Sequence, residues 1–239
     1  QELAARTLAL VREARAQGTT TMEIKSGYGL DVTDELKILD VAAQFTQEVT
    51  FLGGHAVPAE YRGVAGSLGD RDDYVRLVAG PMTDAVAKQG AAKWADVFCE
   101  PHSPYAFDGD ETRVMLEAAA AHGLGVRVHG AQLGPGPGPH IAAEMKAASV
   151  DHCTFLTDDD LDVLASAGTV ATYLPAVEFS TRQPYPDMKR AIDAGVTVAI
   201  ASDCNPGTCF SNSIPFAIAI AVRDMGLTIA QAVWAATAG

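Results

Sequence analysis

Three residues of the types that bind catalytic metals occur in this chain, each at or just after the end of an apolar run. They are His129, His152 and Asp203. Imidazole nitrogens and carboxylate oxygens are ligands of zinc and ferrous iron, and a catalytic site needs about three of them beside a water. A single histidine in such a place is more often an ordinary loop residue. Three such residues in neighbouring units of similar pattern predict a metal-dependent site.

Other polar residues that could contact a ligand have glycine or proline neighbours. His55 follows two glycines, Tyr28 stands between two glycines, and Gln132 precedes a loop rich in glycine and proline. Glycine allows a ligand or another backbone to approach closely. Each residue also has a local interpretation: His55 as a helix cap, Tyr28 as a lid, and Gln132 as a partner of its own loop. Lys25 and Glu100 also end apolar runs, and for them a salt bridge is the better interpretation.

The most informative apolar run is Val196–Asn205, in which small and β-branched residues lead up to Asp203. A continuous apolar run bounded by turn residues is typical of a strand buried on both faces of a parallel sheet. The next residues, Asn205 to Gly207, are typical of a turn. A carboxylate at the carboxyl end of such a strand lies where barrel enzymes build their sites.

Strand and helix patterns alternate along the whole chain. The predicted strands are Thr19–Ile24, Glu48–Leu52, Ala95–Cys99, Gly125–Val128, a short one at Val150, Thr169–Leu174 and Val196–Ser202. The predicted helices are Glu2–Gln17, Asp31–Gln47 with Thr33 as its N-cap, Tyr74–Lys88, Glu111–His122, His140–Ala148, Thr157–Ala167, Met188–Ala194, Ser213–Met225 and Ile229–Ala238. This alternation predicts an α/β fold with a parallel sheet and helices outside it. Potentially catalytic or ligand-binding residues occur at the carboxyl end of nearly every predicted strand, which favours a closed barrel over an open sheet.

A closed (β/α)8 TIM-like barrel needs eight strands, and the pattern predicts seven. The chain also begins with a helix that no strand precedes, and it lacks an initiator methionine. We therefore expect residues 1–239 to be one incomplete barrel domain, with seven of the eight strands present and the first strand upstream.

Composition limits the classes of function. The formal net charge of −13 argues against nucleic-acid binding. No apolar run approaches the roughly 20 residues that span a membrane, and no signal-peptide pattern is visible. The cysteines contain no C-x-x-C pair and are expected to be buried thiols; they are Cys99, Cys153, Cys204 and Cys209. These features predict a cytoplasmic protein that acts on a small molecule.

Six segments together resemble the imidazolonepropionases, a family of the metal-dependent amidohydrolase superfamily. The segments are E-I-K-S-G-Y-G-L (Glu23–Leu30), T-F-L-G-G-H-A-V-P-A-E-Y (Thr50–Tyr61), D-V-F-C-E (Asp96–Glu100), V-H-G-A-Q-L (Val128–Leu133), V-D-H-C (Val150–Cys153) and S-D-C-N-P-G-T-C (Ser202–Cys209). The resemblance covers nearly the whole chain in order, and it implies a barrel of the amidohydrolase type.

The resemblance also implies roles for individual residues. His129 and Asp203 match two of four ligands of a zinc or iron ion, and the other two form an H-x-H motif that this chain lacks. Asp203 and His152 match catalytic residues. The matches to substrate-binding residues are Tyr28, His55, Gln132, Asn205, Gly207 and Thr208. The family further implies a possible homodimer and a small β-sandwich, built from both chain ends, that is absent here.

The reaction that the resemblance implies is the hydrolysis of 4-imidazolone-5-propanoate to N-formimidoyl-L-glutamate in histidine degradation. Two alternatives stay open: another cyclic-amide hydrolase or deaminase of the same superfamily, and an inactive barrel that serves as a binding module. With two of four ligands, the isolated 239-residue chain is expected to bind metal poorly and to be inactive.

Overall fold

Seven parallel strands form one sheet whose order in space follows their order in the chain. The computed structural model describes residues 1–64 and 66–239. The strands are β1 (Glu23–Lys25), β2 (Glu48–Gly54), β3 (Trp94–Cys99), β4 (Gly125–Gly130), β5 (Ser149–His152), β6 (Val170–Tyr173) and β7 (Val198–Ile200). Each predicted strand is confirmed, with ends that differ by a few residues. Because the strands are parallel, their carboxyl ends meet at one end of the sheet, which we call the mouth.

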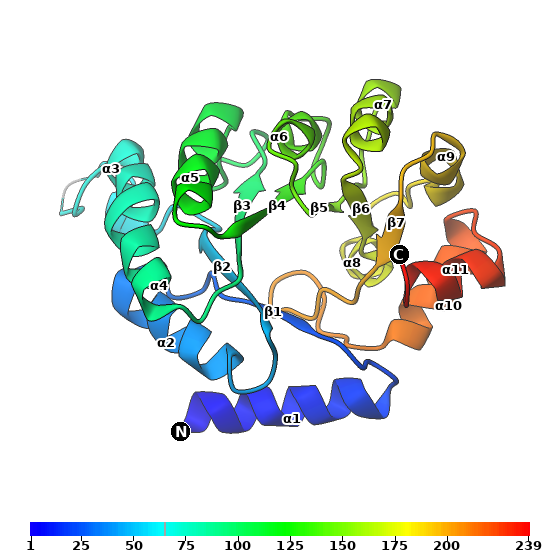
Figure 1. Cartoon of the computed structure of the whole chain (residues 1–239), viewed down its shortest axis with the longest axis horizontal. Coiled ribbons are helices and arrows are strands. Elements are labelled where there is room, and N and C mark those ends of the chain that lie inside the picture. Colours follow the sequence, from blue (N-terminus) through cyan, green and yellow to red (C-terminus); the bar gives the residue numbers. More distant parts are fainter. Residues whose placement is uncertain (65) are drawn as a thin grey trace.

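Helices connect successive strands and lie outside the curl of the sheet (Figure 1). They are α1 (Glu2–Ala16), α2 (Val32–Ala42), η1 (Ala59–Tyr61), α3 (Arg71–Leu77), η2 (Val78–Met82), α4 (Thr83–Gln89), α5 (Gly109–Ala121), α6 (Gly138–Glu144), α7 (Asp158–Ala167), α8 (Pro175–Thr181), α9 (Met188–Asp193), α10 (Ile214–Asp224) and α11 (Ile229–Ala235). None of the helices in the described residues is long and apolar enough to cross a membrane.

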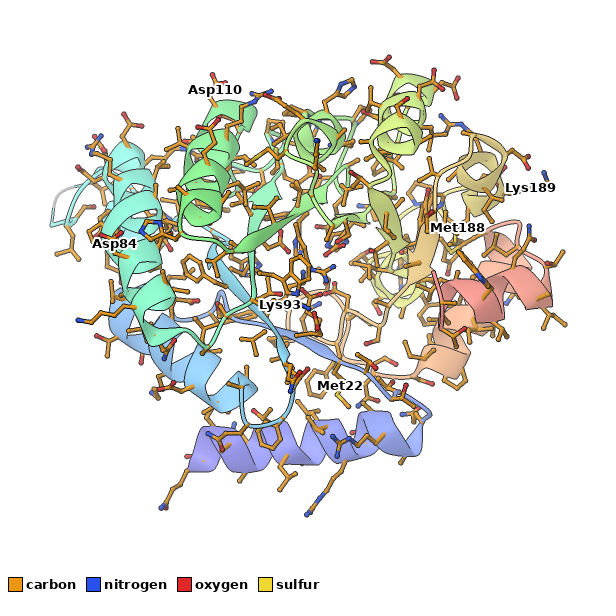
Figure 2. All side chains as sticks on the ribbon, in the orientation of Figure 1. Met22, Asp84, Lys93, Asp110, Met188 and Lys189 are labelled. Carbon is orange, nitrogen blue, oxygen red and sulfur yellow. The ribbon has the colours of Figure 1, made fainter. Side chains whose placement is uncertain are left out.

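The hydrophobic core lies between the sheet and these helices. Leu39 of α2, Leu116 of α5 and Leu164 of α7 are fully buried there, together with Val128 of β4. Figure 2 shows Asp110 and Lys189 on outer helices, pointing away from the sheet. The apolar residues of the strands are therefore explained by burial of the sheet beneath its outer helices.

The sheet is curled and does not close on itself. In the described part of the chain β1 and β7 each have a single strand neighbour, β2 and β6. The segment that follows β7, orange in Figure 1, folds back across this open side towards β1 and α1. Asn212 of this segment accepts a hydrogen bond of 3.0 Å from Gln17 and donates one of 3.4 Å to the carbonyl of Leu10. The open side is thus partly covered by the chain itself.

Local differences from the predicted elements have identifiable causes. The N-cap of α2 is Asp31 rather than Thr33, because the Asp31 carboxylate accepts from the backbone N–H of Asp34 at 2.8 Å. The predicted helix Tyr74–Lys88 is divided by the π-turn Val78–Met82, which contains Pro81. A proline inside a helix has no N–H to donate and crowds the preceding turn. The short helix α8 after Pro175 was not predicted.

Candidate active site

The predicted site residues lie on the loops that leave the strands at the mouth. Tyr28 follows β1 and His55 follows β2, while His129 and His152 stand at the ends of β4 and β5. Asp203 follows β7 by three residues. Because all these strands run in the same direction, residues distant in the sequence meet at one end of the sheet.

Aromatic rings connect four of these residues in a continuous row. The ring centroids of Tyr28 and His55 lie 5.2 Å apart, and those of His129 and His152 also lie 5.2 Å apart. Phe98 of β3 stands between the two pairs, 6.1 Å from His55 and 6.1 Å from His129. The row therefore crosses the mouth from β1 to β5 and could hold a flat polar ligand against its rings.

His129 is buried and faces a carboxylate on the neighbouring strand. Its Nδ1 lies 2.8 Å from Oδ2 of Asp96, and its backbone N–H donates to Oδ1 of the same residue at 3.1 Å. Burial lowers the pKa of His129, but the Asp96 carboxylate outweighs burial, and the net pKa is raised. A carboxylate against one ring nitrogen is the arrangement that orients a metal-binding histidine through the other nitrogen.

The cation that balances Asp96 is Lys25 of β1. Its Nζ lies 2.7 Å from Asp96, 3.0 Å from Asp151 of β5 and 3.1 Å from Glu23. Burial lowers the pKa of Lys25, but the Asp151 and Asp96 carboxylates raise it well above its ordinary value. For Asp96, burial raises the pKa, whereas the charges of His129 and Lys25 leave it lower than usual. The predicted salt bridge of Lys25 is therefore confirmed.

His152 is buried in a neutral form. Burial, and then the charge of His129, hold its pKa well below the ordinary value. Its Nδ1 has no hydrogen-bond partner within the described residues. An unpaired buried nitrogen at a strand end is costly in a purely structural role, so it is available for a ligand.

Asp203 is partly buried and titrates near neutral pH. Burial raises its pKa to about 6, and the charges of His129 and Lys25 oppose that rise. Its Oδ2 accepts a hydrogen bond of 3.1 Å from Asn205. The Asn205 Oδ1 in turn accepts from the backbone N–H groups of Gly207 and Thr208, both at 2.8 Å. The predicted residues Asn205, Gly207 and Thr208 thus form the turn that holds Asp203.

Several residues at the mouth have left-handed backbone conformations that side chains rarely adopt. They are Leu30 after β1, Ala131 after β4, His152 and Cys153 at β5, and Asp203 after β7, with φ between 49° and 83°. Such conformations cost about 1–3 kcal/mol each and persist where the surroundings hold them. Because they lie together at the strand ends, the mouth is the part of the fold in which backbone conformations least follow the preferences of the individual residues.

Two buried carboxylates hold the loops of predicted residues, and sequence reasoning missed the first of them. Glu35 of α2 accepts from the backbone N–H groups of Gly27, Gly29 and Leu30, at 2.7–3.2 Å, and so encloses the loop that carries Tyr28. The approach is close, because a Cβ at Gly29 would lie 2.6 Å from the Glu35 nitrogen. The sequence does contain a sign that Glu35 is buried, because it stands one helical turn before the apolar Leu39 and so shares its face of the helix.

Glu100 does the same for the loop of Gln132. Its Oε1 accepts from the backbone N–H of Gln132 at 2.5 Å and of Leu133 at 3.2 Å. The prediction of a salt bridge at Glu100 is wrong, because the described residues place no cation against it. Gln132 itself is buried.

Asp96, His129 and Asp151 present ligand atoms that all lie within 4.8 Å of one another, a group that could hold a metal ion. The predicted set of His129, His152 and Asp203 is not such a compact group in the described part of the chain. Three carboxylates, on Glu23, Asp96 and Asp151, face two cations, on Lys25 and Arg127. With a neutral imidazole at His129 this network keeps one excess negative charge. The donors and the charge therefore fit a cation at His129.

Comparison with curated proteins finds similar sequences along the whole chain. The imidazolonepropionase of Salinispora arenicola is 58% identical over an alignment of 241 positions, which covers 100% of this chain and 58% of that protein. That of Mycolicibacterium smegmatis is 57% identical over 230 residues, covering 96% of this chain and 55% of the relative. The chain is homologous to the imidazolonepropionases. It spans 58% and 55% of the lengths of these two curated relatives. No family model matches the chain.

Solved structures support the fold. Guanine deaminase from C. acetobutylicum has a TM-score of 0.70 at 11% identity, covering 99% of this chain and 61% of that one. Ochratoxinase from A. niger has a TM-score of 0.64 at 22% identity, and the match covers 98% of this chain and 63% of the ochratoxinase chain. These likenesses confirm the predicted α/β fold of a barrel type, here with seven parallel strands.

Glu178 of α8 is a further buried carboxyl near the mouth. Its Oε1 accepts from the Thr154 hydroxyl at 2.7 Å, and its Oε2 has no hydrogen-bond partner among the described residues. Burial raises its pKa from an ordinary 4.5 to about 7. The folded state therefore keeps this proton between pH 4.5 and pH 7, whereas the unfolded chain loses it.

Glu178→Gln tests this assignment through the pH dependence of stability. Because the folded state binds the extra proton, the wild-type free energy of unfolding falls as the pH rises through this window. The total loss is about 3 kcal/mol at 1.4 kcal/mol per pKa unit. Glutamine cannot ionise, so the variant should match the wild type near pH 4.5 and exceed it by up to that amount at pH 8. Urea denaturation at pH 4.5 and pH 8 measures this difference in the free energy of unfolding, with the exposed Glu117→Gln as control. If the free energies of unfolding of Glu178→Gln and the wild type changed equally with pH, the assignment would be contradicted.

Glu35→Gln tests the carboxylate that holds the Tyr28 loop. The amide replaces a charged acceptor and turns an N–H group towards backbone donors. We therefore expect the free energy of unfolding of the variant to be about 2 kcal/mol lower than that of the wild type. Hydrogen exchange of the Gly29 and Leu30 amides should accelerate, while exchange in β4 is expected to change less. Glu117→Gln again serves as the control. Unchanged protection of these two amides would show that Glu35 does not order the loop.

Proposed function

We propose that the protein carrying this chain hydrolyses 4-imidazolone-5-propanoate to N-formimidoyl-L-glutamate, the reaction that its resemblance to the imidazolonepropionases implies. The observation that carries the proposal is the row of rings at the mouth, with Tyr28, His55, His129 and His152 in sequence. In this proposal residues 1–239 are one metal-dependent hydrolase barrel domain of a cytoplasmic enzyme, with a homodimer as a possible assembly.

His129 and Asp203 are the proposed metal ligands of this chain. Nδ1 of His129 faces Asp96, which leaves Nε2 for the ion. Asp203 interacts with the same histidine through its charge. When bound, zinc or ferrous iron would acidify a water and so supply a nucleophile at neutral pH.

The chain's own residues would move the protons and hold the substrate. Asp203, beside the proposed ion, would accept the proton of the attacking water and release it later. His152 is neutral and has an N–H to donate to the ring oxygen as negative charge develops there.

Tyr28, His55 and Gln132 would orient the substrate. The Nδ1 of His55 lies 2.7 Å from the carbonyl oxygen of Gly27, so this nitrogen donates and the other is left for a ligand. Tyr28 is about half exposed, with its ring against His55. Orientation of this kind lowers the barrier by several kcal/mol. Gln132 cannot exchange protons, and its proposed role is a hydrogen bond to the substrate ring.

Substrate turnover tests the proposal. The natural protein that carries this chain, loaded with zinc or ferrous iron, is expected to consume imidazolonepropanoate with loss of its ultraviolet absorption band. His152→Gln should lower kcat by about 100-fold or more, because it removes an acid–base group. Tyr28→Phe should mainly raise KM if its hydroxyl contacts the substrate in the ground state.

The matched control is His140→Gln, at a histidine of α6 that faces Asp159 and Asp160, away from the row of rings. Turnover of hydantoins or aminopyrimidines in place of imidazolonepropanoate would contradict the proposal, as would full activity of the His152 variant.

A further inference from the structure

The ammonium of Lys25 occupies the centre of the buried acidic group. It connects β1 with β3 and β5, since Asp96 and Asp151 lie 2.7 Å and 3.0 Å from Nζ. The Asp96 side chain is fully buried and that of Asp151 is nearly so. Two buried carboxylates this close would repel each other strongly without a cation between them. Lys25 is therefore the group that makes this pair of acids stable.

Both oxygens of Asp96 are used towards His129. Oδ1 accepts the backbone N–H of His129, and Oδ2 lies against both the imidazole Nδ1 and the Lys25 ammonium. Asp151 is held in the same way on its other side, because its Oδ1 accepts from the Ser149 hydroxyl at 2.8 Å. Loss of Lys25 would therefore leave the imidazole as the one side-chain partner of Oδ2 among the described residues, and the carboxylate could rotate about its remaining hydrogen bond from the His129 backbone N–H.

A metal ion between Asp96, His129 and Asp151 is the competing interpretation of the same residues. That ion would have to displace the ammonium, because Nζ already contacts both carboxylates at hydrogen-bond distance. Lys25 would then lose two of its three carboxylate partners while still largely buried, which is unfavourable for a charged side chain. The contacts thus favour a lysine-neutralised group over a metal site at this position.

We propose that Lys25 is a positioning residue for His129. By holding Asp96 2.8 Å from Nδ1 it favours the tautomer of the neutral ring that carries its hydrogen on that nitrogen, since a carboxylate can only accept. In that tautomer Nε2 is unprotonated at the mouth. The assignment of the ring nitrogen stands on these contacts alone. Its consequence, a higher affinity of His129 for a metal ion, rests on the proposed function.

The variant that tests this role is the double substitution Lys25→Met with Asp151→Asn. It removes one positive and one negative charge, so the net charge beside His129 is unchanged, and any effect reports position rather than charge. It also avoids the unbalanced acids that could prevent Lys25→Met alone from folding. The matched control is Lys93→Met with Glu48→Gln, which removes a 2.7 Å ion pair at the opposite end of the strands.

The first measurement is the ¹⁵N spectrum of the imidazoles in the metal-free natural protein at alkaline pH, with His129→Ala to identify the signal. We expect one tautomer, protonated at Nδ1, in the wild type and the control, and a mixture of tautomers in the Lys25 double variant. The second measurement is zinc affinity by competition with a chelator, which should fall about tenfold or more in the double variant only.

A double variant that folds and keeps both the single tautomer and the wild-type zinc affinity would overturn the proposal. Tighter zinc binding on loss of Lys25 would also overturn it, in favour of a metal site between the acids. Neither readout involves the substrate, so a protein that failed to hydrolyse imidazolonepropanoate but gave the expected spectra would refute the proposed function and leave the role of Lys25 intact.

Discussion

The chain of contacts from Lys25 through Asp96 to His129 is the interaction on which the mouth of the sheet depends. It joins residues from β1, β3 and β4, and through Asp151 it reaches β5. Buried charges are costly to remove from water, and they persist only where opposite charges and hydrogen bonds satisfy them. Here each charged side chain lies beside an opposite charge, and with a neutral imidazole at His129 one excess negative charge remains. The interior of the fold is therefore prepared for a cation at its open end.

A second constraint is the use of buried carboxylates to gather backbone amides. Glu35 encloses the loop of Tyr28, and Glu100 anchors the loop of Gln132. A carboxylate with two or three N–H donors is a rigid support, because charged hydrogen bonds are stronger than neutral ones. Loops held in this way can keep the left-handed conformations found at Leu30 and Ala131. The mouth is thus organised before any ligand arrives, which is what catalysis by orientation needs.

Much of the fold could be predicted, because burial leaves a direct trace in the sequence. The seven apolar runs and the helical patterns between them follow from a sheet covered on its outer face, and the Thr157 cap and the Gly168 stop of α7 are local chemistry. The division of the helix at Pro81 and the short helix α8 could not be read so directly, since tertiary packing decides both.

The candidate site was predictable as a set of strand-end residues, but its supporting residues were not. His129 and Asp203 stand out by type and position, whereas Asp96 and Asp151 look like ordinary polar residues within strands. Their importance arises only when parallel strands bring them to Lys25, which is a long-range contact that no local pattern contains. Glu35 is the exception, because a carboxylate on an apolar helix face is visible in the sequence.

The most direct test of this account is the position of the metal ion. Crystals of the natural protein that carries this chain, grown with zinc and measured on both sides of the zinc absorption edge, would locate it by anomalous scattering. We predict one peak about 2.0–2.2 Å from Nε2 of His129 and from a carboxylate oxygen of Asp203, with Lys25 still between Asp96 and Asp151. A peak between those two carboxylates in place of the ammonium, or one distant from Asp203, would contradict it.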